Sequence, residues 1–247
     1  MDWVNTALAW KHGVTPGVTL SQHRRHSYLS PDAVYEGALL RLVQPGTRWL
    51  DAGGGASPCP HNPGLARHLA DTCAELVGVD PGPNLARNPF VHRAQPSAIE
   101  QADGVYDLVT MRMVAEHVAN PAGLAVALRR LVRPGGTLLI YTVHAWSPTV
   151  LAARVLPAVA RRLGMRWLCA GQDRDVFPAH YRLNTVAQLE ATLAGFTLVR
   201  ADALDDCRTT LRWPRLHDAE LRLRTAFRQV GLAYPESCIL AEFNRDA

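Results

Sequence analysis

The chain has 247 residues, of which 48% are hydrophobic and 19% are charged, and its formal net charge is +4. These values suit a globular domain with a large core and exclude disorder as the main state. The longest stretch without Asp, Glu, Lys or Arg, residues 134–153, is interrupted by prolines and glycines, so no membrane span is expected. A charge of +4 spread over this length is also too dilute to predict a nucleic-acid-binding surface.

The cysteines and the N-terminus bear on the cellular compartment. Five cysteines are scattered along the chain without a Cys-x-x-Cys pair, which favours reduced thiols over a disulfide framework or a structural zinc site. The first ten residues lack the basic and apolar regions of an export signal. We therefore expect a cytoplasmic protein and predict no metal site.

In chain order, the predicted elements alternate between helices and strands. Ser30-Pro31 opens a helix that reaches Val43, and leucines at helical spacing predict helices between most of the later strands. Short apolar runs predict seven strands, at residues 48–52, 75–79, 90–94, 105–111, 137–143, 197–201 and 238–243. This alternation predicts an α/β fold with a Rossmann-like, doubly wound and mostly parallel seven-stranded sheet, whose last strand runs antiparallel after a long connection.

Two segments lie outside the alternation, residues 1–46 and residues 144–185. Ligands of open α/β sheets bind at the carboxyl ends of the strands, where such extra segments can fold over them. We therefore predict a single domain over residues 1–247, with both segments as helical caps.

The first predicted strand ends in an acid and three glycines, Asp51-Ala52-Gly53-Gly54-Gly55. Glycines let the backbone turn sharply and approach a ligand closely. The second strand ends at Asp80-Pro81, where a carboxylate is placed to accept hydrogen bonds from both hydroxyls of a ribose. The structural alternatives are a tight turn without a ligand and a capping role for Asp80.

Three features separate a dinucleotide from another adenosine compound. Pro58 stands where the dinucleotide fingerprint has its third glycine, and the spacing of 25 residues from Gly55 to Asp80 exceeds the usual ~20. Asp51 would repel a phosphate held by the loop, whereas it suits an amino group. These residues favour a ligand without phosphates, with an NAD-dependent oxidoreductase as the alternative.

The ordered set of motifs resembles a known family, the class I S-adenosylmethionine-dependent methyltransferases. It is most similar to their small-molecule, UbiE-like subgroup, called methyltransferase type 11. The similar segments together cover about residues 45–143 and are residues 50–55, 77–80, 95–100, 105–109, 114–121 and 131–138.

The resemblance implies S-adenosyl-L-methionine as the cofactor and assigns residues to each part of it. Asp51 and the backbone of Gly53 and Gly55 would hold the methionine end, and Asp80, followed by Pro81, would hold the ribose. The block Gln95-Pro96-Ser97 would face the adenine, and Met111 and Arg112 would line the sulfonium side. Two positions depart from the family, because Gln95 replaces an acid and Pro96 has no N–H to offer the adenine.

Methyl transfer from a sulfonium is an in-line displacement, in which positioning alone supplies ~7–11 kcal/mol of barrier reduction. A general base is needed for an alcohol or an ammonium acceptor and hardly at all for a carboxylate or a thiolate. The candidate bases are His144, directly after the fifth predicted strand, and His180 and Tyr181. In the family the position of His117 more often anchors a helix start than takes part in catalysis.

The sequence therefore predicts a methyltransferase that acts on a small molecule, with oxygen as the predicted acceptor atom. Besides the oxidoreductase, a non-catalytic protein that binds S-adenosylmethionine is an alternative. Residues 147–166 carry leucines on one face and arginines on the other, which indicates a lid helix or contact with a membrane surface. The identity of the acceptor and the oligomeric state have no signature in the sequence.

Overall fold

The computed structural model describes residues 2–12, 25–148, 150–151, 178–210 and 213–247. Its centre is a seven-stranded sheet with the strand order β3-β2-β1-β4-β5-β7-β6. Every neighbouring pair is parallel except those that β7 makes with β5 and β6. The strands are β1 Arg48–Ala52, β2 Glu75–Val79, β3 Arg93–Gln95, β4 Tyr106–Arg112, β5 Val132–Val143, β6 Phe196–Leu204 and β7 Cys238–Arg245. The predicted doubly wound sheet with an antiparallel last strand is confirmed.

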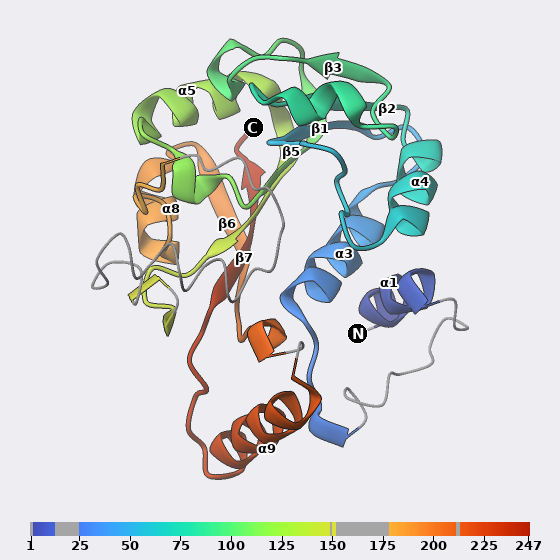
Figure 1. The fold of residues 1–247 in the computed structure, drawn as a ribbon. Coiled ribbons are helices and arrows are strands. Elements are labelled where there is room, and N and C mark those ends of the chain that lie inside the picture. The colour runs from blue at the N-terminus through green and yellow to red at the C-terminus, as the bar shows by residue number, and fades with distance from the viewer. Residues whose placement is uncertain (1, 13–24, 149, 152–177, 211–212) are drawn as a thin grey trace.

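Helices cover both faces of this sheet (Figure 1). The α-helices are α1 Asp2–His12, α3 Pro31–Leu42, α4 Pro63–Thr72, α5 Pro121–Leu131, α8 Val186–Thr192 and α9 Pro214–Gln229. Short 3-10 helices are η1 Pro83–Arg87, η2 Ile99–Gln101, η3 Ala115–His117 and η4 Arg208–Thr210. Ser30, Asn62 and Asn120 cap α3, α4 and α5, each directly before a proline at the first helical position, an arrangement that fixes where the helix begins.

Alternate residues of each strand point into two separate cores. Trp49, Leu108 and Tyr141 pack beneath α3 and α4 on one face, whereas Leu50, Val109 and Ile140 pack beneath α5 and α8 on the other. A third, smaller cluster of Tyr28, Cys207 and Leu221 holds α9 at the end of the molecule (Figure 1). Most central strands are apolar on both faces, as parallel sheets require.

Strand ends differ from the prediction where the chain bends. The strand β5 begins at Val132, which pairs with Tyr106, and a register shift then brings Thr137 opposite Leu108. The Pro-Gly-Gly sequence between them indicated a helix stop alone, yet Gly135, at φ +69°, lets this stretch join the strand. At the other edge, β3 is short and starts at Arg93 rather than at residue 90.

The chain order reverses between β1 and β4, which are neighbours in the sheet although β2 and β3 lie between them in sequence. In open α/β sheets a ligand crevice forms at such a point, outside the carboxyl ends of the strands. The loops that follow β1, β2, β4 and β5 all meet at this edge, which we call the carboxyl edge.

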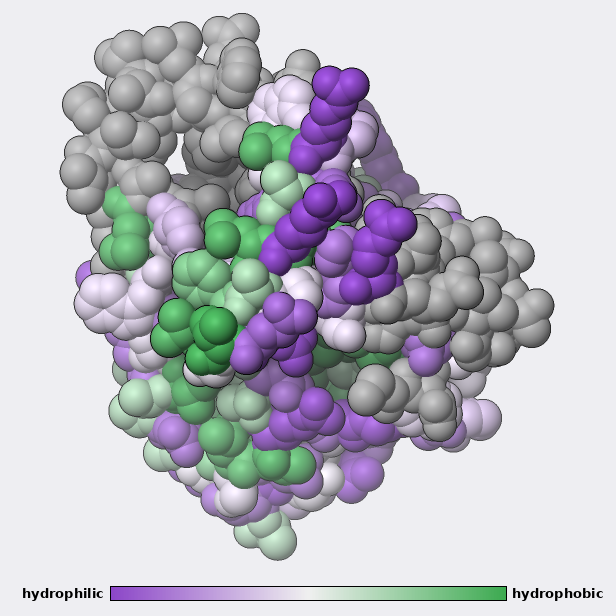
Figure 2. Space-filling model, turned by 90° about the horizontal axis from the view of Figure 1, so that it is seen from below, coloured by the Kyte–Doolittle hydropathy of each residue, from purple (hydrophilic) through white to green (hydrophobic). Residues whose placement is uncertain are grey.

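The surface near α9 mixes apolar and charged residues. Figure 2 shows this side of the molecule, with hydrophobic groups beside long hydrophilic side chains. On α9, Leu216 and Leu223 are exposed and alternate with arginines such as Arg222.

Within the described residues, no helix is long and apolar enough to span a membrane. Most of the predicted helix over residues 147–166, including its arginines, lies outside the described residues.

Candidate functional site

The glycine loop turns directly after β1, and two of its glycines have a positive φ. The N–H of Gly53 donates to the carbonyl of Val79 at 2.7 Å, which ties the loop to the end of β2. Gly53 has φ +72°, and a Cβ there would lie 2.2 Å from Val114, so no other residue fits. At Gly55 a Cβ would meet only the carbonyl of Gly53, at 3.8 Å. The loop is therefore closed on its inner side and open at Gly55.

Asp80, at the tip of β2, holds both the loop and its own turn. One carboxylate oxygen accepts from the N–H of Gly55 at 3.1 Å, and the other accepts from the N–H of Gly82 at 2.6 Å. Its side chain is half-buried. Because each carboxylate oxygen has a second lone pair, Asp80 can accept two ribose hydroxyls while it keeps these bonds. The capping and the ribose-binding readings are therefore compatible.

Asp51 lies beneath the loop rather than on its surface. It is buried, and one oxygen accepts a hydrogen bond of 2.7 Å from the hydroxyl of Thr110, which in turn accepts from Trp49 at 2.8 Å. Burial raises the pKa of Asp51 to about 6, although Thr110 and Arg112 oppose this shift. At neutral pH the carboxylate is therefore mostly ionised, and a negative charge beneath the glycines disfavours a phosphate.

The side chain of Gln95 closes the loop after β3. Its amide donates to the carbonyl of Asp103 at 3.1 Å and accepts from the N–H of Asp103 at 2.8 Å. The N–H of Ser97 donates to the carbonyl of Gln95 at 2.9 Å. Pro81 and Pro96 are exposed on the loops after β2 and β3. The adenine contacts of this block remain a prediction.

The last two residues of β4 point in opposite directions. Met111 is fully buried in the core beneath α5, so the backbone is its accessible part. Arg112 points to the other side, where it donates to Asp32 of α3 at 3.2 Å and lies over the ring of Tyr141 at 5.9 Å. The structure thus brings all predicted cofactor residues to the carboxyl edge, on the adjacent ends of β1 to β4.

The predicted bases lie in two loops beyond β5. The ring of His144 accepts from the N–H of Trp146 at Nδ1, at 3.3 Å, and its Nε2 lies 4.0 Å from Glu236. His180 is exposed, and both it and Tyr181 donate their backbone N–H to the carbonyl of Glu116, at 2.7 and 3.1 Å. The ring Nδ1 of His117 lies 3.1 Å from the carbonyl of Pro178. His117 therefore contacts this cap segment.

A cluster of charged side chains at the carboxyl edge was not predicted. Asp32, in the first turn of α3, is buried between Arg112 and Arg208, with the Nε2 of His61 4.0 Å away. Arg208, which follows β6, also binds Asp206 and donates to the hydroxyl of Tyr141 at 3.2 Å. Although burial acts in the opposite direction, the two arginines hold the pKa of Asp32 below its usual range.

Asn88 is a second residue that the sequence did not single out. Its buried amide donates to the carbonyls of Gly54 and Gly55 at 3.1 and 3.2 Å, and its oxygen accepts from the N–H of Phe90 at 3.0 Å. The side chain therefore holds the glycine loop from behind. A lone asparagine before a proline carries no signal for this role, because the loop is 33 residues away in the chain.

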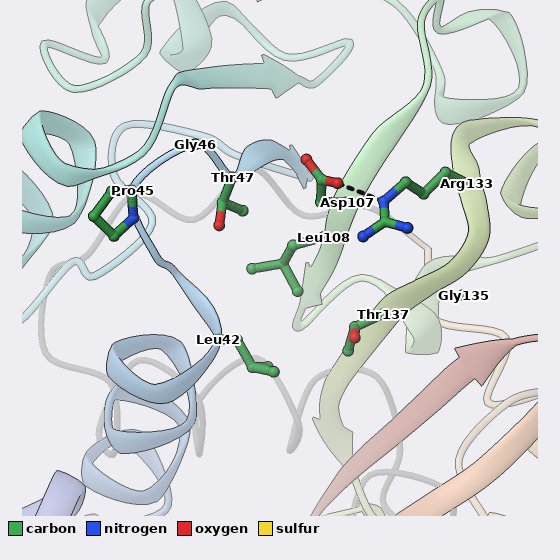
Figure 3. A pocket seen from close by; sticks show the side chains of 9 residues that line it. All are labelled: Leu42, Pro45, Gly46, Thr47, Asp107, Leu108, Arg133, Gly135 and Thr137. Carbon is green, nitrogen blue, oxygen red and sulfur yellow. Dashed lines mark hydrogen bonds and ion pairs between the residues drawn. The ribbon is translucent and has the colours of Figure 1, made fainter.

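A separate hollow of about 310 Å³ lies at the opposite, amino edge of the sheet (Figure 3). Figure 3 shows Arg133 and Asp107 paired at its rim, and Asp107 also accepts from the backbone N–H of Arg48 at 2.8 Å. Its charged groups are thus already paired with one another. Across the described part of the chain, no group of three or more His, Cys, Asp or Glu side chains is arranged to hold a metal ion.

The sequence matches a family model described as a methyltransferase domain over residues 22–201. A ubiquinone biosynthesis O-methyltransferase of Xanthomonas campestris is 30% identical over 138 residues, 50% of this chain and 54% of that protein. An uncharacterized methyltransferase of Mycolicibacterium gilvum is 40% identical over 105 residues, 38% of each chain. The chain thus spans about half the length of the ubiquinone-biosynthesis relatives that it matches.

Solved structures share the fold at low sequence identity. The cyclopropane synthase MmaA2 of Mycobacterium tuberculosis aligns with a TM-score of 0.57 and 18% identity, over 99% of this chain and 94% of that one. The N-methyltransferase NodS of Bradyrhizobium japonicum, solved with S-adenosyl-L-homocysteine, aligns with a TM-score of 0.52 and 16% identity, over 98% and 100%. Together with the family match, the open position at Gly55 and the half-buried Asp80 fit an S-adenosyl compound. The chain belongs to the class I S-adenosylmethionine-dependent methyltransferases.

Proposed function

We propose that this enzyme transfers a methyl group from S-adenosylmethionine to an oxygen atom of a small molecule. The observation that carries the proposal is the pairing of Asp80 with the N–H of Gly55, which joins a ribose acceptor to an open glycine loop. The O-methyltransferase relatives, at 30 and 31% identity, support oxygen as the acceptor atom. The methyltransferase names of the relatives favour this function over a nicotinamide-dependent oxidation.

The positions of the cofactor residues support the roles that we propose for them. Asp80 would accept the ribose hydroxyls, and the backbone of Gly53 and Gly55 would lie against the methionine end. Asp51 is 2% exposed, so its charge acts on an ammonium group mainly through the thin glycine loop. When bound, S-adenosylmethionine supplies an electrophilic methyl group, and the protein orients it and excludes water.

We propose that residues 1–46 and 144–185 form the acceptor side of the crevice. The described parts of both segments support this placement. The first turn of α3 reaches Arg112 through Asp32, and residues 178–184 contact the loop after β4 through Glu116 and Ala119. His144, His180 and Tyr181 are candidate bases in these segments.

Two measurements test this function. Calorimetric titration with S-adenosylmethionine, S-adenosylhomocysteine and NAD is expected to show binding of the first two compounds alone. Incubation with methyl-labelled S-adenosylmethionine and a panel of phenols, alcohols, amines and thiols is expected to label hydroxyl compounds. Tight product binding without labelling of any acceptor would support a non-catalytic binding protein instead.

A further inference from the structure

The loop between the glycines and α4 presents a histidine to the acceptor side. His61 directly precedes Asn62, whose buried side chain caps α4 and also donates to Glu36 at 3.0 Å. The backbone turn from Cys59 to Asn62 is closed by a hydrogen bond of 3.0 Å. The position of His61 is therefore fixed by its neighbours, while 48% of its side chain stays exposed. A ligand can reach this imidazole.

His61 faces a buried carboxylate. Its Nε2 lies 4.0 Å from Asp32, whose side chain is only 4% exposed. By contrast, Nε2 of His144 lies 4.0 Å from Glu236, whose side chain is 45% exposed. A carboxylate shielded from water stabilises a nearby imidazolium more strongly than an exposed one does. Of the two histidines, His61 has the carboxylate partner that better stabilises the imidazolium formed when the ring takes a proton from a ligand.

This pair lies next to the place expected for the reacting methyl group. Asp32 binds Arg112, and Arg112 follows Met111, which pairs with Ala52 just before the glycine loop. His61 belongs to the connection that leaves the same loop. Through Asp32 and Arg112, His61 is thus connected to the end of β4, on the side covered by α3.

Burial and the charges around His61 together favour the neutral form of its imidazole. Arg112 and Arg208 are balanced by Asp32 and Asp206. Burial lowers the pKa of His61, and Arg112, Arg208 and Lys11 act in the same direction, whereas Asp32 opposes them. The imidazole is therefore neutral at pH 7 and able to accept a proton. Because the positive and negative side chains beside His61 balance one another, this surface also suits an uncharged acceptor.

We propose that His61 is the general base for an uncharged alcohol or phenol, with Asp32 as its positioning residue. The inference rests on the proposed function. The acceptor oxygen forms a bond to the methyl carbon as the carbon–sulfur bond breaks, and that electron pair stays on sulfur. The proton of the hydroxyl passes to Nδ1 of His61, the ring nitrogen that does not face Asp32, and solvent then removes it.

The test compares His61→Gln with His144→Gln in the full chain, with labelled S-adenosylmethionine and the best phenol or alcohol of the panel. Loss of a general base costs ~10²–10⁴-fold in rate, so kcat of His61→Gln should fall by that factor. Its affinity for S-adenosylhomocysteine and its thermal midpoint should match those of the wild type. Transfer to a thiol, which ionises without help, should persist, and added imidazole should partly restore His61→Ala.

The pH profile and the resonance of the imidazole give independent readouts. The rising limb of kcat with pH in the wild type should disappear in His61→Gln. If the limb disappears in His144→Gln and persists in His61→Gln, the base is His144 and the inference is overturned. The His61 resonance, assigned by its loss in the variant, should titrate below its ordinary pKa without any acceptor. An imidazole that stays protonated at pH 7, or a His61→Gln enzyme with full kcat, would overturn the inference and leave the proposed function intact. A wild type that labels no hydroxyl compound would refute the proposed function, and the inference with it.

Discussion

Asp80 joins an observed and a proposed role, because the carboxylate that binds the glycine loop is also the one that we propose binds a ribose. A charge-assisted hydrogen bond contributes about 1.5–3 kcal/mol. Under the proposed function, the same residue links the geometry of the glycine loop to the strength of cofactor binding.

Replacing Asp80 by Ala should weaken the binding of S-adenosylmethionine by roughly tenfold or more, because the ribose hydrogen bonds are lost. Calorimetric titration with S-adenosylhomocysteine measures this effect without turnover. Asp80→Asn keeps one acceptor oxygen and should fall between the two. Unchanged affinity in Asp80→Ala would contradict the placement of the ribose.

Glu36 lies on α3, where its buried carboxylate accepts a hydrogen bond from Asn62. Burial raises its pKa to about 7 from an ordinary value of 4.5. The folded state therefore holds the proton more tightly than the unfolded state, so the free energy of unfolding falls as the pH rises from about 4.5 to 7. Once the pH is above about 7, the free energy of unfolding has fallen by about 3 kcal/mol in total.

Glu36→Gln should remove this slope, so that the variant matches the wild type near pH 4.5 and exceeds its stability at pH 8. Denaturant unfolding at several pH values measures how the free energy of unfolding of each protein depends on pH. Glu75→Gln is a control of opposite sign, because hydrogen bonds from Arg48 and Arg93 lower the pKa of Glu75. That variant should lose stability at neutral pH and recover it in acid. If the stability of Glu36→Gln changed with pH in parallel with that of the wild type, the raised pKa of Glu36 would be refuted.

At the scale of elements, the glycine loop is held by its surroundings as much as by its own sequence. Val79 and Asp80 of the β2 end bind it from one side, and Asn88 binds two of its carbonyls from behind. A loop with three glycines would otherwise have a large conformational entropy to lose when it binds a ligand.

Asn88→Ala should leave two carbonyls of the loop without their buried partner, at a cost of about 1–3 kcal/mol in stability. The affinity for S-adenosylhomocysteine should also fall several-fold, because binding must then order the loop. Thermal unfolding and calorimetric titration separate the two effects. Arg87→Ala, an exposed change on the adjoining 3-10 helix, serves as the control. Equal affinity in both variants would argue against this role of Asn88.

At the scale of the whole molecule, α9 contacts the segment that precedes α3, far from it in the sequence. Arg224 is buried and binds Asp205, donates to the carbonyl of His26 at 3.1 Å and lies over the ring of Tyr28 at 5.2 Å. A residue of the C-terminal helix thus fixes the segment that leads into α3. This contact joins residues 26–28, just before α3, to α9.

Arg224→Ala should reduce stability by about 3–5 kcal/mol, because it leaves the carboxylate of Asp205 without its partner. Arg222→Ala lies on the same helix, but its side chain is 71% exposed, and it should cost about 0.5 kcal/mol or less. Hydrogen exchange should become faster in α9 and residues 25–28 of Arg224→Ala, and unchanged in β1 and β4. Equal stabilities for the two variants would contradict this account.

The sequence by itself determined the alternation of strands and helices, the antiparallel last strand, and the glycine loop with Asp80. These features depend on residues close together in the chain, since strand period, helix caps and turn glycines act locally. Where the expected local pattern was absent, as in residues 132–136, the strand boundary was missed.

Only the tertiary structure decided which distant side chains meet. Three interactions join separate segments of the chain. They are the contact of His61 with Asp32, the hydrogen bonds between Gln95 and Asp103, and the hydrogen bonds from Asn88 to the glycine loop. Such pairs are set by how α3 and the loops pack over the carboxyl edge, and burial then fixes the charge of Asp51 and Glu36. Packing and desolvation depend on the whole fold, so no local pattern encodes them.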